Sequence, residues 1–155
     1  LVLMLLLGAS LIWADLEDSA IVVSSGSVNA GDSIILSVTT TEILEEWDVI
    51  AFQFDLYYNE ANVQYINHKP GDLFENAMLM ANGDNEGLVK VACSHWLPQT
   101  GSGTLVELQF LTIAPGDIHL QFDKFKMNSA SMRKCYKISI TASARNLSKS
   151  SFKAS

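Results

Sequence analysis

The run from Ala51 to Tyr58 constrains this chain most, because large and small side chains alternate along it. Phe52, Phe54 and Leu56 are large and apolar, whereas the residues between them are small or polar. Successive side chains of a pleated strand point to opposite faces, so we expect these three to point into a core. The pattern therefore predicts a sheet with one buried face and a second, smoother face that is free to receive a partner.

Short strands separated by turn sequences are expected along most of the chain. Each separator contains Gly, Asn, Asp or Pro, which suit a tight reversal of the backbone. Because no long helix separates the strands, the pattern predicts an all-β, antiparallel sandwich or barrel. Helical turns are expected only near residues 43–47 and 73–76. The expected strands are 20–24, 33–40, 49–58, 63–68, 77–81, 88–94, 104–113, 118–127 and 136–143.

Length and charge limit the size of the fold and its partners. The 155 residues, 48% of them hydrophobic, fit one domain with a sizeable core. All 17 acidic residues lie at or before Asp123, where Lys69 and Lys90 are the only basic ones. An acidic body of this kind repels phosphate groups, so we expect no nucleic acid partner.

The N-terminus has features of an export signal. Residues 1–13 carry no charge, their apolar run is short for a membrane span, and Ala14 precedes an acidic segment. We expect a signal peptide at 1–14, truncated if the chain is a fragment, and a secreted or surface-displayed protein. The alternative is a buried helix or an uncleaved anchor, which would be the only membrane contact. The sandwich is then expected at 20–145, followed by a polar basic tail or linker at 146–155.

Five sequence pieces, taken in order, resemble a cohesin domain. They are Ala-Gly-Asp at 30–32, the strand and Asn at 51–59, Pro-Gly-Asp-Leu at 70–73, Gly-Ser-Gly-Thr-Leu at 101–105 and Ala-Pro-Gly at 114–116. The resemblance implies a nine-stranded jelly-roll β-sandwich without catalytic activity, of the kind that serves as a receptor module in cellulosomes and related cell-surface assemblies. It also implies that a flat sheet face binds a dockerin, a small helical module. The dockerin would carry the calcium, and the cohesin itself would need no cofactor.

The residues themselves predict a surface of the same kind. The outward side chains of the strands at 49–58 and 88–94 are compact enough for a helix to lie flat on them. In cohesins an Asn and an Asp often stand where this chain has Ala51 and Gln53, and an acid often stands near His95. The resemblance therefore implies a changed specificity, a divergent partner or none, and a simply solvated sheet face is the alternative. The predicted partner-binding residues are Ala51, Gln53, Asp55, Tyr57, Lys90, Ala92, Ser94 and His95.

Two tryptophans suggest a competing function. Trp47 and Trp96 lie in connections that we expect to be exposed, where a ring face can stack on a sugar. A carbohydrate-binding module, with a polysaccharide as partner, is therefore the alternative function, and a passive spacer or adhesion domain is a third. The opposite interpretation is that each ring covers one end of the core.

We expect neither a metal site nor a catalytic site. His68, His95 and His119 lack the paired spacing of a zinc site. The turn at 82–87 lacks the regular alternation and the final Glu of a calcium loop. The sequence shows no Gly-flanked Ser, no Cys-His signature and no pair of carboxylates in an apolar setting, so an enzyme is not expected.

The two cysteines have different surroundings in the sequence. Cys93 alternates in phase with Val89 and Val91, which predicts a small core residue, whereas Cys135 lies among basic residues. A disulfide between them would suit an exported chain, but two cysteines define no disulfide framework, so the pairing stays open.

Overall fold

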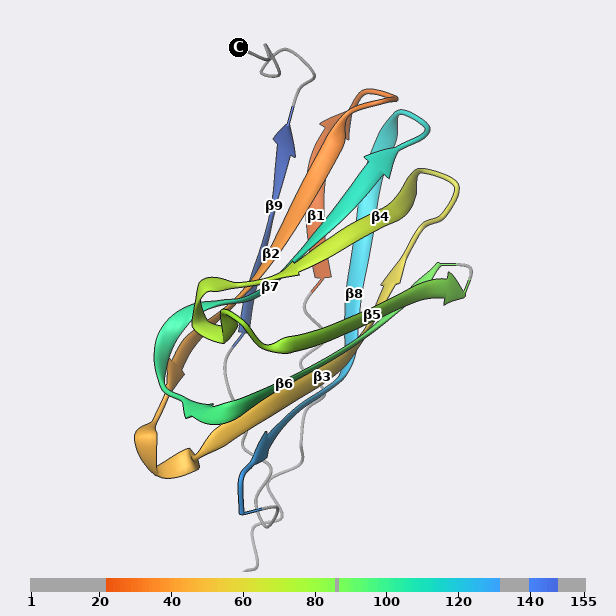
Figure 1. Ribbon diagram of the computed structural model, residues 1–155. Helices are drawn as coiled ribbons and strands as arrows, with labels where there is room; N and C mark the ends of the chain where they lie inside the picture. The colour runs from red at the N-terminus through yellow and green to blue at the C-terminus, as the bar shows by residue number, and fades with distance from the viewer. Residues whose placement is uncertain (1–21, 86, 132–139, 148–155) are drawn as a thin grey trace, which may run out of the picture.

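The computed structural model describes residues 22–85, 87–131 and 140–147 as two antiparallel sheets packed face to face (Figure 1). The strands are β1 (Val22–Val28), β2 (Ser33–Ile43), β3 (Val49–Tyr58), β4 (Val63–Pro70), β5 (Met78–Asn85), β6 (Leu88–Gln99), β7 (Gly101–Thr112), β8 (Gly116–Ser129) and β9 (Ile140–Leu147). One sheet has five strands in the order β1-β8-β3-β6-β5, and the other has four in the order β4-β7-β2-β9. The prediction of an all-β antiparallel sandwich is therefore confirmed.

Most of the predicted strands are present with shifted ends. The described part of the chain also contains two short 3-10 helices, η1 (Glu45–Trp47) and η2 (Asp72–Phe74), close to the predicted helical turns. The strand predicted at 88–94 is longer in the structure, where β6 continues to Gln99.

The last strand was predicted too early in the sequence. β9 occupies Ile140–Leu147 instead of 136–143, and residues 136–139 lie outside the described part of the chain. β9 pairs with β2 from Thr40 opposite Ile140 to Ser33 opposite Leu147, so the partner strand determines where it ends. This strand continues two residues beyond the domain boundary that the sequence predicted at 145.

The core fixes β3 at the centre of the five-stranded sheet. Phe52, Phe54 and Leu56 are 1%, 2% and 0% exposed, as the alternation predicted. The ring of Phe52 meets Phe74 of η2 edge to face at a centroid distance of 4.9 Å, and Phe54 lies 5.2 Å from Phe122 of β8. Because the large side chains of β3 are held inside, its alternate residues must face outward.

Two of the cohesin-like sequence pieces meet at one junction between η2 and β7. The Asp72 Oδ1 atom accepts the backbone N–H of Thr104 at 2.6 Å and that of Leu73 at 3.0 Å. Gly71 packs so closely that a Cβ there would overlap the carbonyl group of Thr104. This close approach explains the glycine at 71 and the aspartate at 72.

Two other pieces lie near the end of β7, each against a different segment of the chain. The N–H of Gly31 donates to the Thr112 carbonyl at 2.6 Å, and the N–H of Thr112 donates to the Asp32 carbonyl at 2.8 Å. Gly116 has a φ of 146° and lies against the side chain of Asn62. These pieces hold strand connections together, so they identify a fold and not a partner.

Some predictions fall on residues outside the described part of the chain. These are the signal peptide at 1–14, Cys135 and the tail beyond 147. Within the described residues, no helix combines the length and apolar character that crossing a membrane requires.

Candidate partner-binding face

Four neighbouring strands, β8, β3, β6 and β5, present their outward side chains in a regular grid. Strand register defines three rows, each read from β5 to β8. The rows are Met78, Ser94, Ala51 and Asn128; then Met80, Ala92, Gln53 and Lys126; then Asn82, Lys90, Asp55 and Asp123. We call these positions the outer face. Neighbouring strands are about 4.8 Å apart, so each row is about 14 Å wide.

Most of the predicted partner-binding residues lie together on the outer face. Six of them occupy the middle two columns of the grid, on β3 and β6. Tyr57 continues the outward phase of β3 beyond the grid and is 39% exposed. The sequence alternation was sufficient to predict which residues of β3 and β6 face outward, because both strands keep a strict period of two in this region.

His95 is the exception. Ser94 pairs with Ala51 and Gln99 pairs with Val49, so residues 95–98 form a protrusion in β6. The half-buried His95 ring lies inside this protrusion, where its Nδ1 atom accepts the Leu97 N–H at 3.0 Å and lies 2.9 Å from Nε2 of Gln99. The structure therefore places His95 as a support for the protrusion and not in the grid.

The two tryptophans are in different environments. Trp96 is 80% exposed in the protrusion, and its ring stacks on that of His95 at 5.8 Å. Trp47 is half-buried and packs against the core, so the prediction that it is exposed was wrong. A shared sugar platform requires two exposed rings, and Trp47 is partly used for packing.

Sequence reasoning missed two exposed methionines on the edge strand β5. Met78 and Met80 are 72% and 68% exposed, opposite Ser94 and Ala92 respectively. Residues 77–81 are all apolar, so their pattern did not indicate which of them point outward. The strand register alone identifies them as part of the outer face.

A β-bulge in β8 adds two lysines to the other side of the same face. Gln53 pairs with Lys126 and Asp55 with Asp123, so one residue of β3 between these pairs lies opposite two of β8. The extra residue is Lys124, which has a left-handed φ of 53°. Because the bulge changes the phase of the strand, Asp123 and Lys126 both pair with outward residues of β3 although they are three residues apart. Lys124 and Lys126 are both exposed.

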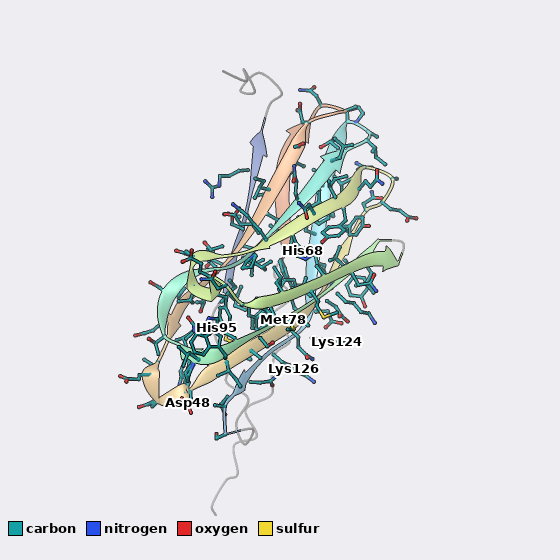
Figure 2. The ribbon with its side chains drawn as sticks, viewed as in Figure 1. Asp48, His68, Met78, His95, Lys124 and Lys126 are labelled. Atoms are coloured by element: carbon teal, nitrogen blue, oxygen red, sulfur yellow. The ribbon has the colours of Figure 1, made fainter. Side chains whose placement is uncertain are left out.

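An ion pair connects the bulge to the centre of the face. Lys124 Nζ lies 3.1 Å from Oδ2 of Asp55. The hydrogen bond to Asp55 and its negative charge raise the pKa of Lys124, so this lysine is charged at neutral pH. In Figure 2, Lys124 and Lys126 lie toward one side of the five-stranded sheet, whereas His95 and Asp48 lie toward the other end of β6 and β3.

The outer face adjoins a depression that core-facing side chains such as Phe54, Leu79 and Val91 also line. The depression, of about 630 Å³, lies over β8, β3, β6 and β5 and also touches His68 of β4. Its outward-facing lining includes Gln53, Met80, Lys90, Ala92, Lys124 and Lys126. Ala92 is the small outward residue of this lining, and the longer Met80 and Lys126 belong to the strands on its two sides.

The three histidines lie on three different strands, β4, β6 and β8. Among the described residues, no cluster of three His, Cys, Asp or Glu side chains could hold a metal ion. His68 is hydrogen-bonded to the hydroxyl of Tyr65, and His119 is exposed on β8. Cys93 is 4% exposed, which confirms it as a core residue, and burial raises the pKa of its thiol to about 12.

Comparisons with known proteins agree on one family. The sixth cohesin of Acetivibrio cellulolyticus scaffoldin B, solved in complex with a mutant Cel5 dockerin, is 14% identical with a TM-score of 0.64 and covers 79% of this chain and 96% of that one. A cohesin module from a Clostridium perfringens family 33 glycoside hydrolase is 8% identical with a TM-score of 0.63, covering 82% and 95%. A non-cellulosomal cohesin from the archaeon Archaeoglobus fulgidus is 15% identical with a TM-score of 0.59, covering 70% and 75%.

At these identities the solved structures show a common fold. A search of curated proteins found no match. The family model described as cohesin domain matches residues 19–114, which is more than half of the chain. This chain therefore belongs to the cohesin domain family.

Proposed function

We propose that this chain is a non-catalytic module that captures a dockerin-like protein through its outer face, outside the cell or at its surface. Captured dockerins would link it to polysaccharide breakdown. The observation that supports this most is the combination of a cohesin domain match with small side chains at the centre of the outer face, namely Ala51, Ala92 and Ser94.

The centre of the outer face suits a partner helix. Ala92 and Ser94 are exposed and Ala51 is half-buried, so these three positions present only small side chains to a helix that approaches β3 and β6. Beneath them Phe52, Phe54 and the rest of the core hold both strands rigidly. A rigid surface loses little conformational entropy on binding, which favours affinity.

The solved relatives support the class of partner. This chain shares its fold with the cohesin of a cohesin–dockerin complex from Clostridium thermocellum and with the cohesin of a type II complex from Acetivibrio cellulolyticus.

We propose that a dockerin-like partner brings its own calcium and that this chain contributes no metal ligand. Chelation should then prevent capture by unfolding the partner, while the Tm of this chain stays unchanged.

Selection from a display library of natural dockerin modules, carried out in calcium, tests this proposal. The captured modules are then titrated against the Ala92→Arg variant and against the Ser143→Arg variant. Ala92 lies at the centre of the outer face, whereas Ser143 is exposed on β9 of the other sheet. An Arg at the centre of a flat interface introduces both bulk and an unpaired charge, so affinity should fall by about 100-fold or more.

The control variant should bind within about twofold of the parent, because single surface changes away from an interface have little effect. Both variants should keep the parent's Tm to within a few degrees, which separates loss of binding from loss of folding. Capture of no dockerin at all, or capture that Ala92→Arg leaves intact, would overturn the proposal.

A further inference from the structure

The outer face changes in character from one side to the other. Its β5 side is apolar, because Met78 and Met80 are 72% and 68% exposed. The exposed Trp96 and Leu97 of the protrusion extend this apolar character at the Ser94 end of β6. Exposed apolar side chains gathered in this way mark an interaction surface, and methionines adapt readily to a partner's shape.

The β8 side carries two exposed lysines beside the half-buried Asp123, although the chain as a whole has a net charge of −7. Lys124 and Lys126 lie on β8, and Lys90 lies opposite Asp55 on β6. Asp55 is paired with Lys124. Within the described residues, neither Lys90 nor Lys126 has an ion pair, so both are available to an anionic group.

The width of the face limits what can lie between these two sides. The row from Met80 to Lys126 is about 14 Å wide, and an α-helix with its side chains is about 10–12 Å across. Ala92 and Gln53 form the floor of the row. A helix lying along β3 and β6 would therefore have one flank against Met80 and the other against Lys126.

We propose that the outer face selects a dockerin-like helix with apolar side chains on the flank toward β5 and Asp or Glu side chains on the flank toward β8. This rests on the proposed function and adds the chemistry of the partner. On the β8 side a basic flank would meet Lys126 with like charge, and an apolar flank would bury that lysine without a partner. An acidic flank gives Lys126 an ion-pair partner, and Lys90, on the middle strand β6 beside Asp55, adds positive charge near the centre of the face.

A second library tests this inference. The exposed helix positions of one calcium-loaded dockerin are randomised, displayed and selected on this protein. We expect Asp and Glu to be enriched on one helix flank and Leu, Ile, Met or Phe on the other. Binding of the selected modules should weaken by about tenfold in the Lys90→Gln, Lys126→Gln double variant at low salt, and by less at high salt, because the attraction is screened.

Two controls assign the effect to the β8 side. Lys69→Gln removes the same type of charge from β4 of the other sheet, and it should change affinity by no more than about twofold. In the second control, Lys126→Glu should abolish capture of an acidic binder, and a Glu→Lys change on that binder's flank should restore it. Such rescue requires that the two charges face each other.

The outcomes separate this inference from the proposed function. If binders depend on Ala92 but carry basic or neutral side chains toward β8, the inference is overturned while dockerin capture stands. If enrichment is acidic but the lysine variants bind normally, the inference is also overturned. If neither library yields a binder, the proposed function fails, and the inference fails with it.

Discussion

Individual side chains in this fold behave according to the face on which their strand places them. Cys93 and Ser94 are neighbours on β6, yet the first is 4% exposed and the second lies on the outer face. The burial that makes Cys93 part of the core also opposes its ionisation, because a thiolate is poorly solvated among apolar side chains.

Cys93 is therefore expected to be unreactive in the folded protein. Burial raises the pKa of its thiol from 9.0 to about 12, so at pH 8 the side chain is a protonated and inaccessible thiol. Iodoacetamide should modify Cys93 only after unfolding, as measured by mass spectrometry of the Cys93 peptide. Rapid modification of the native protein at this residue would show that the thiol is accessible.

The same shift makes stability depend on alkaline pH. A pKa that is higher in the folded state adds stability below pH 9, and that stability is lost as the pH rises from 9 toward about 12. The free energy of unfolding should therefore decline more steeply over this range in the parent than in Cys93→Ala. If the free energy of unfolding declined equally with pH in the two proteins, the raised pKa of the Cys93 thiol would be contradicted.

At the level of elements, short junctions determine how the strands are joined. At the junction of η2 and β7, Gly71→Ala should lower the free energy of unfolding by about 2 kcal/mol, because a Cβ would overlap the Thr104 carbonyl and displace Asp72 from its hydrogen bonds. Urea denaturation measures this change. The exposed Ser102→Ala variant is the matched control and should be within about 0.5 kcal/mol of the parent. An unchanged midpoint for Gly71→Ala would contradict the close packing.

The bulge in β8 makes a prediction that depends on the backbone at Lys124. Its left-handed φ of 53° suits Asn and is unfavourable for a β-branched residue. Both Lys124→Asn and Lys124→Val remove the ion pair to Asp55, but the Val variant should have a Tm about 4 °C lower than the Asn variant. Thermal unfolding followed by circular dichroism compares them. Equal Tm values would indicate that the bulge is absent in solution.

The parts that sequence reasoning predicted are those controlled by local patterns. The alternation at 52–56 predicted the buried face of β3, and the turn residues predicted the order of the strands, although most strand ends are shifted. The bulge at Lys124 depends on how β8 pairs with β3, so no local pattern indicates it. For the same reason the exposed Met78 and Met80 were missed, since their neighbours are also apolar.

At the level of the whole molecule, family and partner preference are determined by different residues. The cohesin-like pieces at 70–73 and 101–105 form a junction with β7 of the four-stranded sheet, whereas the outer face belongs to the five-stranded sheet. A chain can therefore keep the family's fold while its outer face changes. This explains why the residues at Ala51 and Gln53 depart from the pattern that the family often shows while the junctions keep theirs.

Hydroxyl-radical footprinting of the complex with a selected dockerin tests the central claim most directly. Methionine and tryptophan side chains react readily with the radical, and Met78, Met80 and Trp96 are exposed on or beside the outer face. Ile66 is 48% exposed on β4 of the other sheet and serves as the internal reference. We predict that the partner protects Met78, Met80 and Trp96 and leaves Ile66 unchanged. Protection of Ile66 with unchanged oxidation of the other three would place the partner on the wrong sheet and contradict the account.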